Sequence, residues 1–210
     1  RSIVITYKSG GIVAVDSKAR WVQWKSDSVQ RSLNIVNSDF RVDVDDYGNF
    51  WIRTNEGLLI HVRKSGKWYT SMADFFKGEG FSCDYNYLIK DVEVDAVGNH
   101  WLATDHGGLI IFNMKTKACR QFLSVKNDAT TISDNTIQYI YMDDIHRMWI
   151  STYSNGLNQW SEYNEGFGNI PLGDICTCVE ERPGVLWAGS NDSGLVRYDT
   201  NTGEKTYFTE

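Results

Sequence analysis

Apolar and polar residues alternate in short runs along most of this chain. In residues 42–45, valine alternates with aspartate, which is the period-2 pattern of a β-strand with one buried face. Three further apolar runs follow, at residues 50–54, 58–62 and 68–69, and each is separated from the last by a turn rich in Gly, Asn or Ser. The segment therefore predicts four short antiparallel strands.

The same unit recurs along the chain around a tryptophan, at a spacing of roughly 40 to 50 residues. An acidic residue stands six positions before each tryptophan, a hydroxyl residue three positions after it, and a leucine eight positions after it. A worn copy at the start of the chain has Val4 in the tryptophan position. The good copies comprise Trp51, Trp101, Trp149 and Trp187; Asp45, Asp95, Asp143 and Glu181; Thr54, Thr104, Thr152 and Ser190; and Leu59, Leu109, Leu157 and Leu195.

Four short strands in each repeat are typical of a β-propeller blade. We therefore predict an all-β protein, a β-propeller fragment of about four and a half four-stranded antiparallel blades in one domain, residues 1–210. The predicted blades are residues 38–70, 88–123, 137–163 and 174–209, with part of a blade at residues 1–25. Residues 71–81 form the only plausible short helix, which we interpret as an insertion between blades.

A closed ring of seven blades at this period needs roughly 300 residues or more, so we expect this ring to be open. An open ring leaves the apolar faces of its end blades uncovered. We therefore expect the piece to associate with itself, or to be completed by the remaining blades of a longer parent chain.

The repeated residues are interpreted as structural, because a residue that recurs once in each blade performs the same packing role each time. We expect the tryptophan to fill the gap between neighbouring blades, the acid to cap the turn that follows it, and the hydroxyl to bond nearby backbone. Cys178 is in register with Val42, Val92 and Ile140, and we expect it to be a small core residue.

The second good copy, around Trp101, carries a family resemblance in Asp95, Gly98, Trp101, Thr104, Gly107, Gly108 and Leu109. This frame resembles the two-component regulator propeller repeat, which forms the sensor region of hybrid histidine kinases. The resemblance covers essentially the whole chain. It implies a periplasmic location, as the extracytoplasmic part of an inner-membrane protein, with further blades, a transmembrane helix and a kinase elsewhere in the parent chain. It also implies sensing of a carbohydrate-derived signal.

Composition excludes some partners. The formal net charge is −6, and no basic cluster exceeds two adjacent cations, so we expect no nucleic-acid partner. No apolar run is long enough to span a bilayer, so we expect no membrane contact by this segment itself.

No metal or cofactor is predicted. The spacing Asp43-x-Asp45-x-x-Gly48 superficially resembles a calcium loop, but Tyr47 occupies the third ligand position and Thr54 stands where that loop needs its closing Glu. The histidines are scattered, and we interpret His100 and His146 as surface residues. Asp143 and Asp144 are interpreted as solvated acids of a turn. No pair of Cys and His residues, or triad of Ser, His and Asp, has a catalytic spacing, so we predict no catalytic residue.

The chain has four cysteines, Cys83, Cys119, Cys176 and Cys178. An even number in a periplasmic protein permits disulfides without showing them.

The candidate ligand-binding residues lie in the turns between the second and third strands of the blades, which vary while the frame around them does not. Their amide, carboxylate and aromatic side chains suit sugar hydroxyls, with stacking on the tyrosine, although a plain polar surface is the alternative. The residues are Asn55, Glu56, Asp105, His106, Tyr153, Asn155, Asn191 and Asp192.

Three functions are therefore weighed. The favoured one is a ligand-sensing or protein-interaction module with no enzyme activity in this segment. The second is an enzyme, either a quinoprotein dehydrogenase, whose repeats end like residues 198–205, or an antibiotic-cleaving lyase, which needs a pair of His and acidic residues on a closed ring. The third is a pure docking scaffold. Clustered titratable groups in one blade mouth would favour the enzyme, and an exposed apolar patch on a closed ring would favour the scaffold.

Overall fold

A computed structural model describes residues 3–6, 12–15, 21–24, 40–45, 47–54, 57–161, 166–190 and 194–209. The chain divides into two compact units, Arg1–Asn86 and Tyr87–Glu210. Over these described ranges, no helix is long and apolar enough to cross a membrane.

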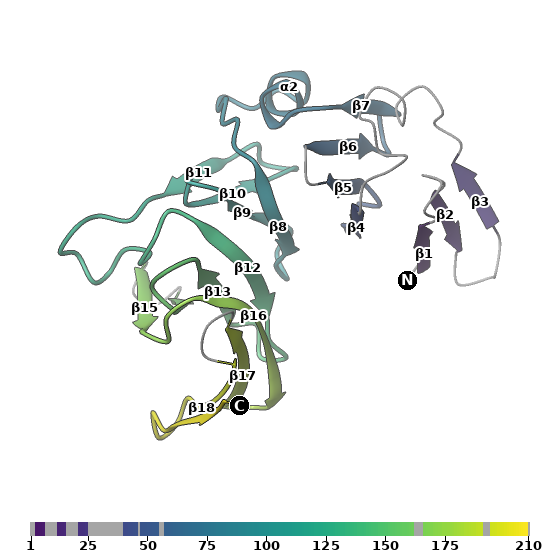
Figure 1. Cartoon of the computed structure of the whole chain (residues 1–210). Coiled ribbons are helices and arrows are strands. Elements are labelled where there is room, and N and C mark those ends of the chain that lie inside the picture. The colour runs from purple at the N-terminus through teal and green to yellow at the C-terminus, as the bar shows by residue number, and fades with distance from the viewer. Residues whose placement is uncertain are drawn as a thin grey trace. The chain divides into compact units, whose positions relative to one another are not determined.

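The first unit contains two antiparallel sheets and a short helix (Figure 1). The three-stranded sheet consists of β1 (Ile3–Thr6), β2 (Ile12–Val15) and β3 (Trp21–Trp24). The four-stranded sheet consists of β4 (Phe40–Val44), β5 (Phe50–Thr54), β6 (Leu58–Val62) and β7 (Lys67–Tyr69), in that order.

The helix α2 (Met72–Gly78) confirms the prediction of a short helix after the first good repeat. Ser71 caps its N-terminus, because the Ser71 hydroxyl accepts a hydrogen bond from the Asp74 backbone N–H at 3.1 Å. The helix belongs to the core of the first unit. Phe75 is fully buried, and its ring meets the ring of Trp51 edge-on at 5.3 Å between centroids.

The second unit contains three four-stranded antiparallel sheets, and the strands of each sheet lie in sequence order. This meander arises because short turns connect each strand to the next. The strands are β8 (Ile89–Val94), β9 (Asn99–Thr104), β10 (Leu109–Asn113) and β11 (Cys119–Phe122); β12 (Ile137–Met142), β13 (Met148–Thr152), β14 (Leu157–Ser161) and β15 (Gly166–Ile170); and β16 (Ile175–Arg182), β17 (Val185–Ser190), β18 (Gly194–Asp199) and β19 (Lys205–Phe208). The predicted fold class, all-β with four-stranded blade-like sheets, is confirmed.

The core of the second unit lies between consecutive sheets. Trp101 on β9 joins a buried cluster with Ile140 and Ile150 of the next sheet. Trp149 on β13 joins a second cluster with Leu186 and other residues of the β16–β19 sheet. Trp101 and Trp149 therefore fill the gaps between neighbouring blades of this unit, as the sequence predicts.

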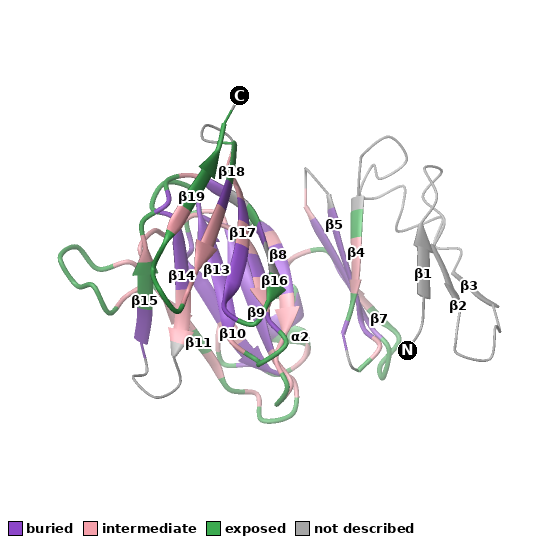
Figure 2. Ribbon diagram, turned by 90° about the horizontal axis from the view of Figure 1, so that it is seen from below, coloured by how far each residue is buried: buried purple, intermediate pink, exposed green. Residues whose placement is uncertain are grey.

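The outer face of the last sheet is open to solvent. The repeated leucine is fully buried in the first two sheets of the unit, as Leu109 and Leu157, but Leu195 on β18 is 41% exposed. Its cross-strand partner Phe208 on β19 is 48% exposed. Figure 2 shows β19 largely in the colour of exposed residues. Within the second unit, no other described sheet covers this face.

The first good repeat departs from the predicted alignment at its leucine. In the β9–β10 pair, Ala103 lies opposite Leu109, whereas in the β5–β6 pair Arg53 lies opposite Leu58. Leu58, rather than Leu59, therefore occupies the structural position of the repeated leucine. The prediction at this position is wrong because the β5–β6 turn is shorter by one residue, and that shift reverses which side chain faces which way.

Candidate functional site

The acidic residue before each tryptophan organises the turn between them. One oxygen of Asp95 accepts the backbone N–H groups of Val97 at 3.1 Å and Asn99 at 2.8 Å. Its other oxygen accepts the Asn99 side-chain amide at 2.8 Å and the Trp101 indole N–H at 3.0 Å. The prediction that the acid caps the turn is confirmed at Asp95, and the bond to the indole adds a tie to the inter-sheet core.

The same tie recurs in the other repeats. The indole N–H groups donate to their acids at 3.1 Å in Trp51–Asp45, 2.9 Å in Trp149–Asp143 and 2.8 Å in Trp187–Glu181. A bond that recurs in every good repeat serves the architecture rather than a single binding site.

The hydroxyl after the tryptophan closes the turn at the other end of the strand. Thr104 donates to the Gly108 carbonyl at 2.6 Å, and Thr152 donates to the Gly156 carbonyl at 3.0 Å. The predicted bond to nearby backbone is confirmed for these two residues. The turns that carry Asp105, His106, Tyr153 and Asn155 are therefore held rigidly at their base.

Two residues expected at the surface are buried. The side chain of Asp143 is 0% exposed, because it sits beneath its own turn. Burial raises its pKa, but hydrogen bonds from Trp149 and Arg147, with the charge of Arg147, hold the pKa below its ordinary value. His100 is likewise 0% exposed and stacks on Phe112 with ring centroids 4.7 Å apart. The expectation of solvent-exposed positions is wrong for both.

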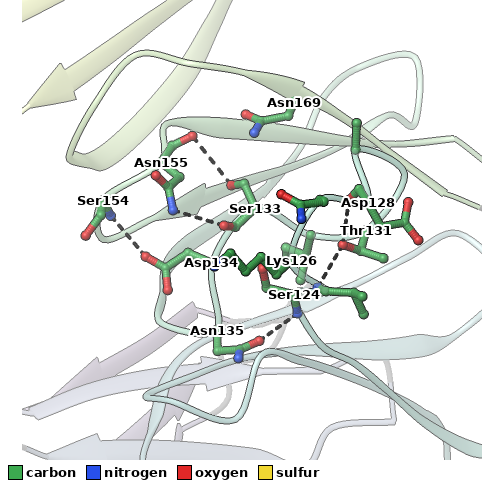
Figure 3. Close-up of a pocket in the computed structure, with 14 residues that line it drawn as sticks. Ser124, Lys126, Asp128, Thr131, Ser133, Asp134, Asn135, Ser154, Asn155 and Asn169 are labelled. Atoms are coloured by element: carbon green, nitrogen blue, oxygen red, sulfur yellow. Dashed lines mark hydrogen bonds between the residues drawn. The ribbon is translucent and has the colours of Figure 1, made fainter.

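A polar hollow of about 760 Å³ is the main candidate site (Figure 3). The connection between β11 and β12 supplies most of its lining, from Ser124 to Asn135, and the β13–β14 turn and β15 supply the rest. Its volume falls within the usual range of small-molecule sites, roughly 300–1,000 Å³. The lining side chains are mostly amides, hydroxyls and carboxylates, including Asp128, Ser133, Asp134, Asn155 and Asn169.

Hydrogen bonds fix one wall of this hollow. Asn155 donates to the Ser133 carbonyl at 3.0 Å, and Asp134 accepts the backbone N–H of Ser154 at 3.3 Å (Figure 3). Beneath them, the fully buried Asn158 donates to the Ser133 hydroxyl at 2.9 Å and accepts the Ser133 backbone N–H at 3.0 Å. The loop and the turn are thus joined into one rigid wall.

Other polar groups of the hollow remain available. The side chains of Lys126, Asn127 and Asn169 are exposed and make no hydrogen bond or ion pair with the described part of the chain. Asp128 is also exposed, and hydrogen bonds from the Thr130 side chain and backbone hold its pKa below its ordinary value. The hollow therefore offers amide donors and acceptors, one ammonium group and a carboxylate that stays ionised.

The predicted ligand residues fall into three groups. Asn155 lines the hollow. Tyr153 is 55% exposed but is not part of the lining, and Asp105 instead contacts the Nδ1 of His106 at 2.6 Å and forms an ion pair with Lys90 at 3.5 Å. Asn55, Glu56, Asn191 and Asp192 lie outside the described residues.

Sequence reasoning missed most of the lining, because it considered only the turns within blades. The signal was present in the connection between β11 and β12, residues 123–136, which is longer and more polar than the connection between β15 and β16, residues 171–174. Long connections between elements commonly carry function.

The cysteines divide into bonded and free groups. Cys83 and Cys119 are disulfide-bonded. Cys178 is a free, buried thiol in the core beside Ala188, which confirms its interpretation as a core residue. Burial, and to a lesser extent the charge of Asp91, raises the pKa of Cys178 to about 12. Within the described ranges, no group of three or more His, Cys, Asp or Glu residues is placed to hold a metal ion.

Comparison with known proteins gives structural rather than sequence matches. No protein-family model matches the sequence, and no curated protein matches it by sequence. An extracellular domain assigned to a hybrid two-component system of B. thetaiotaomicron superposes with a TM-score of 0.67 and 21% identity, over 80% of this chain and 24% of that one. A second extracellular domain from B. thetaiotaomicron, assigned to a one-component or hybrid two-component system, gives 0.66 and 16%, over 98% and 27%.

Propellers of other kinds also match. Virginiamycin B lyase from Staphylococcus aureus superposes with a TM-score of 0.59 and 11% identity, over 98% of this chain and 68% of the lyase. This chain spans about a quarter of the length of the two B. thetaiotaomicron domains. At these identities the matches establish the fold, and the chain has the architecture of a β-propeller with about four blades.

Proposed function

We propose that this chain is a ligand-sensing part of the extracytoplasmic receptor of a hybrid two-component signalling protein, and that the polar hollow binds a carbohydrate-derived ligand. The hollow itself is the observation that supports this most. Sugar hydroxyls both donate and accept hydrogen bonds, and the side-chain amides of Asn127, Asn155 and Asn169 do the same. Because Asn155 and Ser133 are already fixed, little side-chain entropy is lost on binding at that wall.

Two further observations support the location and the signalling role. Disulfides persist in oxidising compartments, so the bonded Cys83 and Cys119 favour an extracytoplasmic protein. The fold is shared with extracellular domains assigned to two-component systems. A membrane segment and a histidine kinase in the parent protein belong to the proposal.

An enzyme has less support than a sensor. The lyase shares the fold with this chain at 11% identity. Lys126, Asp128 and Asp134 are the charged residues among those that line the hollow, and no histidine is among them. Asp134 is engaged with the backbone N–H groups of Thr136 and Ser154, so it is a poor candidate for a general base.

A docking role is the second candidate, and the open face of the β16–β19 sheet favours it. Leu195 occupies a position that the neighbouring sheets bury, and Phe208 beside it is also exposed, so this face suits another blade, from the parent protein or from a second copy. Sedimentation velocity over a range of concentrations tests the second-copy form. If the chain is a monomer at every concentration, a second copy does not cover this face, and a blade of the parent protein is the remaining partner.

The ligand proposal is tested by isothermal titration of the full chain against a panel of oligosaccharides from plant and host glycans. Asn127→Ala and Asn169→Ala should each weaken binding by about tenfold, since each removes a hydrogen-bonding pair of groups. Neither side chain bonds to the described part of the chain, and the left-handed backbone of Asn127, with φ +67°, lies in an exposed loop, so both variants should fold. Asn201→Ala, in the exposed β18–β19 turn, is the matched control. Binding that is unchanged in both hollow variants would place the site elsewhere.

A further inference from the structure

A second concavity, separate from the polar hollow, lies beside strands β9, β10, β11 and β14. We call it the aromatic groove. Its volume is about 290 Å³, and Trp101, Trp160, Phe122 and Ile111 form its apolar wall, with Arg120 among its polar residues. No residue of the polar hollow lines it.

The wall of the groove is a preformed cluster of aromatic rings. Trp160 meets Trp101 edge-on at 5.8 Å and Phe122 at 5.3 Å between ring centroids, and it also contacts Phe167 at 4.9 Å. Trp160 and Phe122 are only half-buried, although both pack on the core between the two sheets. The rings are therefore rigid, and part of their surface is left uncovered. Such a wall suits another flat, apolar group.

A guanidinium group stands at the same wall. The Arg120 guanidinium carbon lies over the Phe122 ring, 4.8 Å from its centroid. This stacking holds the planar fork in place while its N–H groups stay exposed, and Arg120 forms no ion pair with the described part of the chain.

The carboxylate of Asp95, which also lines the groove, has no hydrogen-bonding capacity left for a ligand. Asp95 accepts four hydrogen bonds within its own turn, from Val97, twice from Asn99, and from Trp101. An ionised carboxylate has about four lone-pair sites, so Asp95 is saturated. Asn99 and Asn113 bond to each other at 2.9 Å. Arg120 is therefore the charged group of the groove that can take a new partner.

We propose that the aromatic groove binds a small aromatic carboxylate. The ring of the ligand stacks against Trp160 and Phe122, and its carboxylate accepts a two-point hydrogen bond from Arg120. The inference does not depend on the proposed function, because the groove and the polar hollow share no residue.

The test uses the full chain and two probes, 3-phenylpropionate and 2-phenylethylamine. Ligand-observed NMR reports binding directly. Tryptophan fluorescence also reports it, because Trp101 and Trp160 line the groove. A ligand this small should bind with a Kd on the order of 0.1–1 mM. 3-Phenylpropionate should bind, whereas 2-phenylethylamine, with the same ring and the opposite charge, should bind at least tenfold more weakly.

Variants assign the site. Arg120→Gln should weaken the binding of 3-phenylpropionate at least fivefold. Arg182→Gln, at an exposed arginine on β16, should leave this affinity unchanged. Phe122→Leu keeps an apolar side chain at the wall, so it should weaken the binding of 3-phenylpropionate while preserving the fold. Circular dichroism checks the fold. Asn127→Ala in the polar hollow should have no effect, so failure of one proposal is distinguishable from failure of the other.

Three results would overturn the assignment. The first is the absence of binding by 3-phenylpropionate up to about 10 mM, well above the expected range. The second is equal binding of the acid and the amine, which would make the groove a general apolar surface. The third is unchanged affinity in Arg120→Gln.

Discussion

The carboxylate of Asp143 accepts the indole N–H of Trp149 at 2.9 Å, and both side chains are fully buried. The same carboxylate also bonds the backbone N–H groups of Ile145 and Arg147 and the Arg147 guanidinium. One residue thus caps the turn, pairs a cation and anchors the tryptophan that fills the gap to the next sheet.

Replacement of Asp143 should therefore be costly. Asp143→Ala leaves the Trp149 indole N–H buried without its acceptor, and we expect a loss of about 2–4 kcal/mol in the free energy of unfolding. Urea denaturation followed by tryptophan fluorescence measures this. Asp144→Ala, at the exposed neighbouring residue, should change stability by less than about 0.5 kcal/mol. Equal effects in the two variants would contradict the role given to Asp143.

His61 should make the first unit sensitive to acid. Burial lowers the pKa of His61 from 6.5 to about 4, so between these values the unfolded chain binds a proton that the folded chain does not. The stability that His61 contributes is complete above pH 6.5 and is lost as the pH falls towards 4. We expect the loss to be on the order of 1–3 kcal/mol.

His61→Phe should flatten this pH dependence, because phenylalanine keeps the ring between Phe50 and Trp68 without the titrating group. His106→Asn is the control, since the His106 side chain is 84% exposed. Urea denaturation at pH 7 and at pH 4.5 supplies the comparison. A wild-type stability that is equal at the two values would refute the argument.

Two glycines with similar backbone angles should respond differently to alanine. Gly156 has φ +82°, and a Cβ there would overlap the Ile170 carbonyl and the Leu172 backbone nitrogen. Gly203 has φ +75°, but a Cβ would enter open space. We expect Gly156→Ala to cost more than about 3 kcal/mol and Gly203→Ala about 1–2 kcal/mol, the cost of the left-handed backbone alone. Thermal denaturation of the two variants measures this difference in stability.

The cysteines should differ in reactivity. Cys178 is buried with its pKa raised to about 12, so the thiolate that reacts with iodoacetamide is scarce and inaccessible. In the native protein we expect no label on Cys178, Cys83 or Cys119. In urea alone, Cys178 should become labelled. In urea with a reductant, all three cysteines should become labelled. Peptide mass spectrometry locates the label, and labelling of native Cys178 would argue against this packing.

Two equivalent leucines test the open face. Leu157→Ala removes a fully buried side chain and should cost about 2–5 kcal/mol, whereas Leu195→Ala, at 41% exposure, should cost less than about 1 kcal/mol. The measurement is urea denaturation at two protein concentrations. A large, concentration-dependent cost for Leu195→Ala would mean that a second copy covers this face.

Much of the fold follows from the sequence because the repeat is an average over several copies. Any one strand is short, yet four acids at the same distance from four tryptophans specify one local structure. The prediction is wrong where a copy differs by a single residue, as at Leu58 and Leu59, since the pattern does not fix the length of an individual turn. It is also wrong at Asp143 and His100, because charge suggests exposure and only the folded turn supplies their burial.

The candidate site is less predictable, for a related reason. The sequence points to Asn155 because that position varies between blades within a constant frame. Asn127 and Asn169 come from a connection between sheets and from an outer strand, which no repeat brings into register. Their proximity depends on tertiary packing, as with Arg120 and Trp160 across two sheets of the aromatic groove.

The sheets of the second unit are not interchangeable, and Asp91 shows why. Its buried carboxylate accepts the backbone N–H of Ile140 at 3.0 Å, a bond that crosses from one sheet to the next. The corresponding positions of the following sheets hold Tyr139 and Thr177, neither of which is acidic. The donor is a backbone N–H, which every sheet offers, but among the three sheets of this unit the acidic acceptor belongs to the β8–β11 sheet. A copy of either later sheet in its place would leave the buried N–H of Ile140 without this acceptor, so the first two sheets are matched by a side chain that the repeat does not supply.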